Sequence, residues 1–103
     1  MIIHSIHEAN YTPSPEGVKF ARLYASENLV VAHIILAPHQ TLAAHKVPGD
    51  ACLYILEGTP DITLGTEKRT CSAGQLIESP KNIEKILANP TDAPARIMVI
   101  REM

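Results

Sequence analysis

The chain has 103 residues, of which 46% are hydrophobic, only 4% are aromatic and none is tryptophan, so its length and composition fit one domain with an aliphatic core. Its formal net charge is −2, from nine basic and eleven acidic residues, and no run of like charges occurs. Nucleic-acid binding, which needs a basic patch, and electrostatic attachment to a membrane are therefore not expected.

The chain begins with a short apolar segment, Met1–Ile6, which we expect to add an edge strand, either to its own sheet or to that of a partner subunit. The segment lacks the basic start and long apolar run of a signal peptide. No stretch of the chain approaches the roughly 20 apolar residues of a membrane span. A cytoplasmic protein is therefore expected. His4 and His7 have no third metal ligand beside them, so we interpret them as exposed or edge-strand residues.

The rest of the chain is predicted to form about eight or nine short strands, because runs of aliphatic and β-branched residues alternate with turn residues. The predicted strands span 17–26, 29–37, 43–47, 51–57, 61–64, 68–71, 75–78, 83–88 and 95–101. No segment has the period of an amphipathic helix. Many short strands with closely spaced turn signals are typical of an all-β sandwich or barrel.

One polar residue, His33, interrupts the most apolar of these strands, which spans 29–37. We interpret it as a core or interface histidine with hydrogen-bond partners, because buried polar groups are nearly always paired. The alternative is that His33 lines the interior of the barrel and faces a ligand.

The chain has two cysteines, Cys52 and Cys71, which are too few for a disulfide framework. They favour a reduced, intracellular protein with two small buried side chains. A bridge between them would require that their strands be neighbours.

Two segments carry a spaced pattern of histidine, glycine, proline and asparagine. They are PHQTLAAHKVPGDACLYILEG, about residues 38–58, and GQLIESPKNIEKILAN, about residues 74–89. This pattern resembles the two motifs of the cupin superfamily, whose spacing is matched by His45, Gly58, Gly74, Pro80 and Asn89. The resemblance covers roughly residues 29–101. It implies a single domain over residues 1–103 with the fold of a small cupin-type jelly-roll β-barrel.

The resemblance also implies a degenerate metal site. Of the family's four ligands only His45 is kept. The second histidine of the first motif is replaced by Val47, the glutamate by Ala51 or Cys52, and the histidine of the second motif by Lys85. A protonated lysine repels a cation, and a metal needs three or four converging ligands. No metal or other cofactor is therefore expected.

A metal site of another kind is the less favoured possibility. A divalent transition metal would then be held by His45 and Cys52, joined by Asp50, His33 or His39.

Two turns of the motifs carry a side chain where the family favours glycine. His39 takes the glycine position of the first motif, so we expect the backbone of that turn to differ. Asn82 takes the corresponding position of the second motif, and asparagine tolerates a left-handed backbone well.

Lys85 shares one strand face with Ile83 and Leu87, and the resemblance places it opposite His45 across the barrel. A lysine desolvated in this way would have a lowered pKa, and it would act as a base, form a Schiff base or bind an anion. The favoured hypothesis is a small-molecule-binding barrel with ligand-binding candidates His45, Lys85, Cys52 and His33.

Two enzymatic hypotheses stay open beside it. The first is a metal-free isomerase or lyase that uses His45 and Lys85, and the second is the metal-dependent enzyme with an atypical ligand set. Whether the chain is an enzyme, and which ligand it binds, is not decided by these residues.

A homodimer is expected because a domain of this size exposes much of its surface. The apolar ends of the chain, Met1–Ile6 and Ile97–Ile100, and the family resemblance favour the same expectation.

Overall fold

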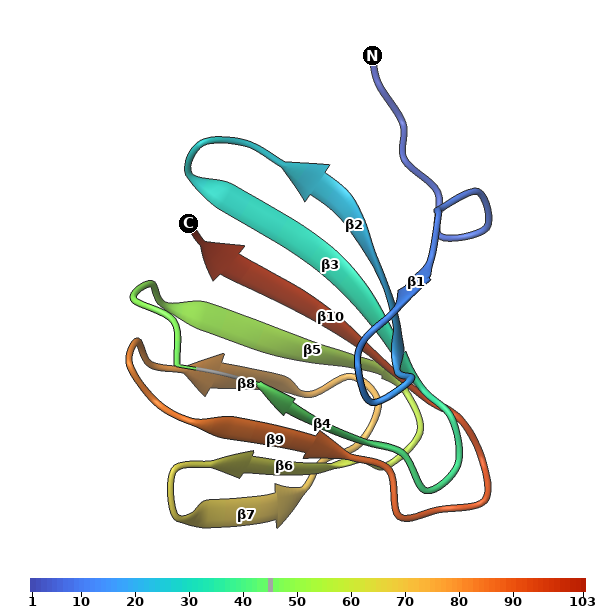
Figure 1. The fold of residues 1–103 in the computed structure, drawn as a ribbon, viewed down its shortest axis with the longest axis vertical. Helices are drawn as coiled ribbons and strands as arrows, with labels where there is room; N and C mark the ends of the chain where they lie inside the picture. The colour runs from blue at the N-terminus through green and yellow to red at the C-terminus, as the bar shows by residue number, and fades with distance from the viewer. Residues whose placement is uncertain (45) are drawn as a thin grey trace.

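The computed structural model describes residues 1–44 and 46–103. In this part of the chain every regular element is a β-strand (Figure 1). In chain order the strands are β1 (Thr12–Pro13), β2 (Lys19–Ala25), β3 (Leu29–Leu36), β4 (Thr41–Ala44), β5 (Ala51–Glu57), β6 (Asp61–Leu64), β7 (Glu67–Thr70), β8 (Leu76–Ser79), β9 (Lys85–Ala88) and β10 (Ala95–Glu102).

The strands form two antiparallel sheets that lie one above the other in Figure 1. The larger sheet has the order β1-β2-β3-β10-β5-β8 and the smaller one the order β4-β9-β6-β7. Strands far apart in sequence are therefore neighbours, such as β3 with β10 and β4 with β9. The predicted all-β jelly-roll barrel is confirmed.

Most strands form where the sequence predicts them, within one or two residues at the ends. β5 and β6 match their predicted ranges, whereas β7 and β8 are displaced by one residue. β9 begins at Lys85 rather than at residue 83. These small shifts are expected, because turn residues mark where a strand ends only to within one or two residues.

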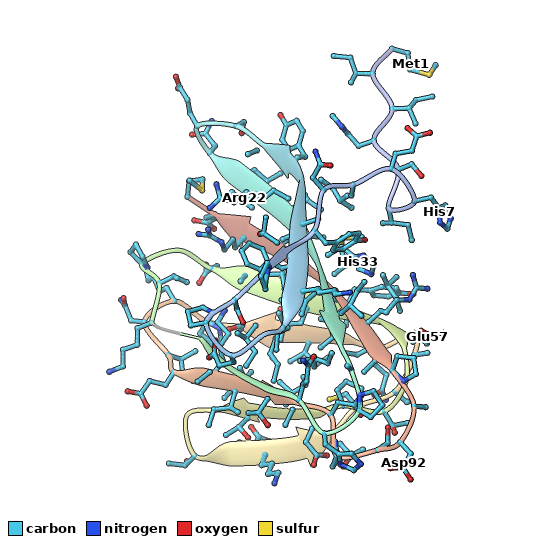
Figure 2. All side chains as sticks on the ribbon, turned by 45° about the vertical axis from the view of Figure 1, so that its right-hand side comes forward. Met1, His7, Arg22, His33, Glu57 and Asp92 are labelled. Carbon is cyan, nitrogen blue, oxygen red and sulfur yellow. The ribbon has the colours of Figure 1, made fainter. Side chains whose placement is uncertain are left out.

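The prediction of an edge strand at Met1–Ile6 is wrong within the single chain. Residues 1–5 have no regular structure, and Met1 lies far from the sheets in Figures 1 and 2. The edge strand is instead β1, in a segment where no strand was predicted. It pairs with β2 through Thr12 and Pro13. Pro13 is tolerated there because an edge strand leaves one row of N–H groups unpaired.

The core is aliphatic, as the composition predicts, and it occupies one end of the barrel. Leu36, Ile55 and Ile97 of the larger sheet are fully buried there and pack with Ile62 and Leu87 of the smaller sheet. Each such side chain contributes about 1.5–3 kcal/mol relative to an exposed one. This packed end holds the two sheets together.

Asn89, the last residue of the second motif, ties the turn after β9 to the end of β3. Its side-chain nitrogen donates to the carbonyls of Leu36 at 3.0 Å and Ala93 at 2.7 Å. Its side-chain oxygen accepts from the backbone N–H and hydroxyl of Thr91. Since Asn89 is buried, these bonds are needed to offset the loss of water.

The two turns that carry a side chain in place of glycine both keep a left-handed backbone. The φ angle is 63° at His39 and 59° at Asn82. Asn82 thus adopts the left-handed backbone that asparagine tolerates well, and His39 adopts a similar φ angle although it carries a side chain. The expected difference of the His39 turn from the glycine turn of the family stays a prediction. The His39 side chain contacts Asp92 at 2.8 Å in solvent.

Replacing His39 by glycine is therefore expected to stabilise the protein by about 0.5–1 kcal/mol. A left-handed backbone costs an L-residue roughly 1–2 kcal/mol, and part of the gain is offset by the greater freedom of glycine in the unfolded chain. The exposed His39–Asp92 pair contributes little. Chemical denaturation would measure the change. His39→Ala, which removes the pair but keeps Cβ, is the control, and a glycine variant no more stable than the alanine variant would contradict the explanation.

Candidate functional site

A cavity of about 420 Å³ lies between the two sheets and adjoins the packed core, with which it shares Ile34, Leu53 and Leu87. Its described lining comes from both sheets and from two loops. It comprises Ser14, Phe20, Arg22, Val30, Ala32, Ile34, Leu42, Val47, Leu53, Lys85, Leu87, Val99 and Arg101. Apart from one serine and three cations these residues are all apolar, so the cavity is a hydrophobic hollow with a few polar groups, as ligand pockets are.

The hollow exists because the inward-facing residues become smaller along the strands. On β3 the inward position changes from Leu36 in the core to Ala32 and Val30 in the cavity. On β5 it changes from Ile55 to Ala51, which pairs with Arg101 and shares its face. Small side chains on one sheet leave space that the aliphatic residues of the other do not fill.

Three cationic side chains line this hollow, and they come from both sheets. Lys85 belongs to β9 of the smaller sheet, where it pairs with Ala44 and Leu64. Arg22 and Arg101 belong to β2 and β10 of the larger sheet, where they occupy two adjacent inward-facing rows on either side of β3. Lys85 is only 6% exposed, Arg101 is half-buried and Arg22 is exposed, so the charges run from the interior to the rim.

None of these three cations forms an ion pair with a described residue, although Arg101 also borders a groove lined by Asp50, Glu78 and Glu102, and Arg22 borders one lined by Glu8. No ion pair or side-chain hydrogen bond connects Lys85, Arg22 or Arg101 to residues 1–44 or 46–103. The described lining contains no aspartate or glutamate. Ser79, in the same inward-facing row as Ala51 and Arg101, has a buried hydroxyl without a partner in the same part of the chain. The site is thus rich in donors and poor in acceptors.

Burial lowers the pKa of Lys85 below its ordinary value of 10.5, and the positive charge of Arg101 lowers it further. Both effects disfavour the ammonium form, because the charge loses water and gains a like neighbour. Lys85 thus faces inward among aliphatic residues, as the parity of its strand predicts.

The other predicted site residues are not gathered around Lys85. His45 lies outside the described residues, so it stays a candidate from the sequence alone. Cys52 lies on the outer face of β5, opposite in direction to Leu53, which lines the cavity. It borders a separate groove with Leu29, Ile100 and Glu78.

His33 also lies outside the cavity, since its neighbours Ala32 and Ile34 face inward and it faces outward. This placement corrects the alternative interpretation of His33 as a cavity residue. The N-terminal segment covers it (Figure 2), and its Nδ1 is 2.6 Å from the hydroxyl of Tyr11. Burial, and secondarily Arg96, lower its pKa. The predicted core or interface role fits in part, because Nε2 lacks a partner in the described chain.

The described residues do not fit the metal site of the family. Val47 and Lys85 stand in two ligand positions and line the cavity, and Ala51 rather than Cys52 faces inward at the third. A methyl group, an isopropyl group and a cation supply no ligand for a divalent ion. His39 and Asp50 are engaged elsewhere, with Asp92 and the backbone of Lys81.

In residues 1–44 and 46–103 no three His, Cys, Asp or Glu side chains are close enough to hold an ion. Both cysteines are free thiols. Burial raises the pKa of Cys71, which disfavours the thiolate form that binds metals.

Two residues of the site, Arg22 and Arg101, were missed by the sequence reasoning. The available signal was their strand parity, since Arg22 shares a face with Phe20, and Arg101 with Val99. Arginine is ordinarily placed in solvent, so the residue type favoured an outward position in spite of this parity.

The family model described as Cupin domain matches residues 32–101. No curated protein matches the sequence. A predicted oxalate decarboxylase from Thermotoga maritima has a similar structure, with a TM-score of 0.89 at 12% identity, covering 99% of each chain. The protein TT1209 from Thermus thermophilus has a TM-score of 0.84 at 21% identity, covering 99% of this chain and 97% of its own.

The polyketide cyclase RemF from Streptomyces resistomycificus is also similar, with a TM-score of 0.86 at 15% identity, covering 99% of this chain and 79% of its own. At these identities the three structures support the fold alone. Among the residues described here, no helix is long and apolar enough to cross a membrane.

Replacing Lys85 by methionine is expected to raise the free energy of unfolding at pH 7 by about 1–2 kcal/mol, the usual gain when a strained functional residue is removed. At that pH the unfolded chain carries a charge that the folded barrel disfavours. The penalty falls as pH rises and disappears above 10.5, where the lysine is neutral in both states, so the gain should shrink with pH. Chemical denaturation of the wild type and the variant at pH 7 and at pH 10.5 measures this gain in the free energy of unfolding at each pH. Lys81→Met, at an exposed turn, is the control, and a gain independent of pH would contradict the assignment.

Proposed function

Because the chain belongs to the cupin family, we propose that it is a small-molecule-binding barrel that lacks the family's usual metal site. The cavity of about 420 Å³ carries this proposal. Its volume falls within the range of roughly 300–1,000 Å³ that is usual for ligand pockets. Aliphatic walls supply affinity by burying apolar surface, and a few polar groups at one side supply orientation.

Lys85 is the residue on which ligand binding depends most in this proposal, with Arg101 and Arg22 beside it. His45 joins them as a candidate through its position in the first motif. Cys52 and His33, which face away from the cavity, are left out of the proposed site. A cytoplasmic location stays a prediction from the sequence.

A second candidate function is a metal-free isomerase or lyase, and the lowered pKa of Lys85 favours it. A neutral amine is a nucleophile: its lone pair attacks a carbonyl carbon, and loss of water from the adduct leaves an imine. His45 would serve as the acid or base for proton transfer. The metal-dependent alternative has no such support, since the described residues in the ligand positions do not fit an ion.

We also propose a homodimer that forms through the outer face of the larger sheet. A row of residues crosses this face from β2 to β8, through Ala21, His33, Met98, Tyr54 and Leu76. Tyr54 and Leu76 are exposed, whereas Ala21 and His33 are already buried in the single chain, and the apolar N-terminal residues 1–3 are almost fully exposed. A second copy would bury this apolar surface, and a symmetric pair is the commonest assembly of small domains.

A fragment screen by ligand-observed NMR tests the cavity as a binding site. We expect hits with the wild-type protein and loss of most of them in Ala32→Phe, because the added ring fills the hollow. Ala73→Phe, in the exposed turn between β7 and β8, is the control and should keep the hits. Hits that bind both variants equally, or a screen without hits, would contradict the proposal. A hit that wild type converts and Lys85→Met does not would establish the enzymatic alternative instead.

Size-exclusion chromatography with light scattering tests the dimer. We expect a mass of about twice the 11.2 kDa of one chain. Tyr54→Glu should shift the protein toward one chain, because it places a charge in the apolar face. Thr66→Glu, in the turn between β6 and β7 of the other sheet, should have no effect. A wild-type mass of 11.2 kDa at micromolar concentration would rule out this assembly.

A further inference from the structure

We infer that the ligand of this cavity is a small organic acid, whose carboxylate is held by Lys85, Arg101 and Arg22 and whose apolar body packs against the cavity walls. This inference rests on the proposed function and deepens it by naming the class of ligand. The charges, the missing counter-ions and the character of the walls each contribute an argument.

The first argument is the convergence of three cations from two sheets on one hollow. Lys85 extends from the smaller sheet, and Arg101 and Arg22 extend from the larger sheet on either side of β3. The protein as a whole carries a net charge of −2, so this local excess of positive charge is not a property of the entire surface. Low-dielectric walls strengthen the attraction of such a cluster for an anion.

The second argument is that a buried cation without a counter-charge is unfavourable, and Lys85 is only 6% exposed. No acidic residue is in the described lining of the cavity, and no described residue forms an ion pair with Lys85. A carboxylate placed between Lys85 and Arg101 would supply the missing negative charge. The same anion would reverse the effect that lowers the pKa of Lys85, so binding should be accompanied by proton uptake when part of the lysine is neutral.

The third argument concerns the remainder of the ligand. Phe20, Leu42, Leu53 and Val99 present hydrocarbon to the hollow. The described lining offers no carboxylate or carboxamide to accept hydrogen bonds from a sugar-like ligand, and Ser14 has the only hydroxyl in that lining. A polyhydroxylated molecule would therefore lose hydrogen bonds on entering, whereas an apolar body would gain from burial.

A carboxylate fits these donors better than a bulky polyanion does. Its two coplanar oxygens match the fork of an arginine guanidinium, and the ammonium group of Lys85 offers three further donors. An inorganic anion satisfies the charges but leaves the apolar walls without a partner. The walls thus distinguish an organic acid from free phosphate.

Calorimetric titration with two matched pairs of compounds tests the inference. Benzoate is compared with benzamide, and hexanoate with hexanamide, because each pair shares its shape and differs in charge. At pH 7 we expect at least one acid to bind tenfold or more tightly than its amide. Lys85→Met should weaken that acid at least tenfold and leave its amide unchanged. Lys81→Met, which removes an exposed lysine, should behave as wild type.

Three results would overturn the inference. If acid and amide bound equally, the cavity would be a neutral pocket, and the proposed function would stand without the acid. If inorganic phosphate bound as tightly as either acid, the apolar body would not be required. If neither acid bound at about 20–50 millimolar, a range set by the weak affinity of fragments of this size, the acid assignment would fail. Failure of the proposed function is separate, since it requires that the wider fragment screen also give no hits.

Discussion

The interlocking of aliphatic side chains from two sheets at one end of the barrel holds the fold together, and the other features depend on it. Leu36, Ile55 and Ile97 meet Ile62 and Leu87 there with almost no exposed surface. The buried asparagine after β9 closes the same end by hydrogen bonds to the backbone on both sides of it. Because this end is complete, the other end can carry small residues and uncompensated charges without the sheets separating.

The charged end is unfavourable for folding but suits the proposed binding of an anion, and both properties follow from the same burial. A lysine at the surface would be hydrated and weakly attractive to an anion. Lys85 loses that hydration inside the barrel, and its interaction with any anion there is correspondingly stronger. Residues of this kind are expected where stability has been given up for function.

The fold could be predicted largely from sequence, and the site only in part. Strand positions follow from β-branched runs and turn residues, and the inward direction of Lys85 follows from its parity with Leu87. The outward direction of His33 and Cys52 is not evident from local pattern, because both lie in strands that are apolar on both faces. The outer side of His33 contacts Tyr11 of the N-terminal segment, a long-range contact with no signal in the sequence around it.

Strand β10 passes through both ends of the barrel within eight residues. Ala95 and Ile97 belong to the packed core, and Val99 and Arg101 belong to the hollow, with one strand providing both. The positions that form the core and those that line the hollow are therefore neighbours in a single strand, and Val99 contributes to both. Natural or directed evolution can alter selectivity at the second pair while leaving the first untouched, which makes this small barrel a suitable starting point for designed receptors.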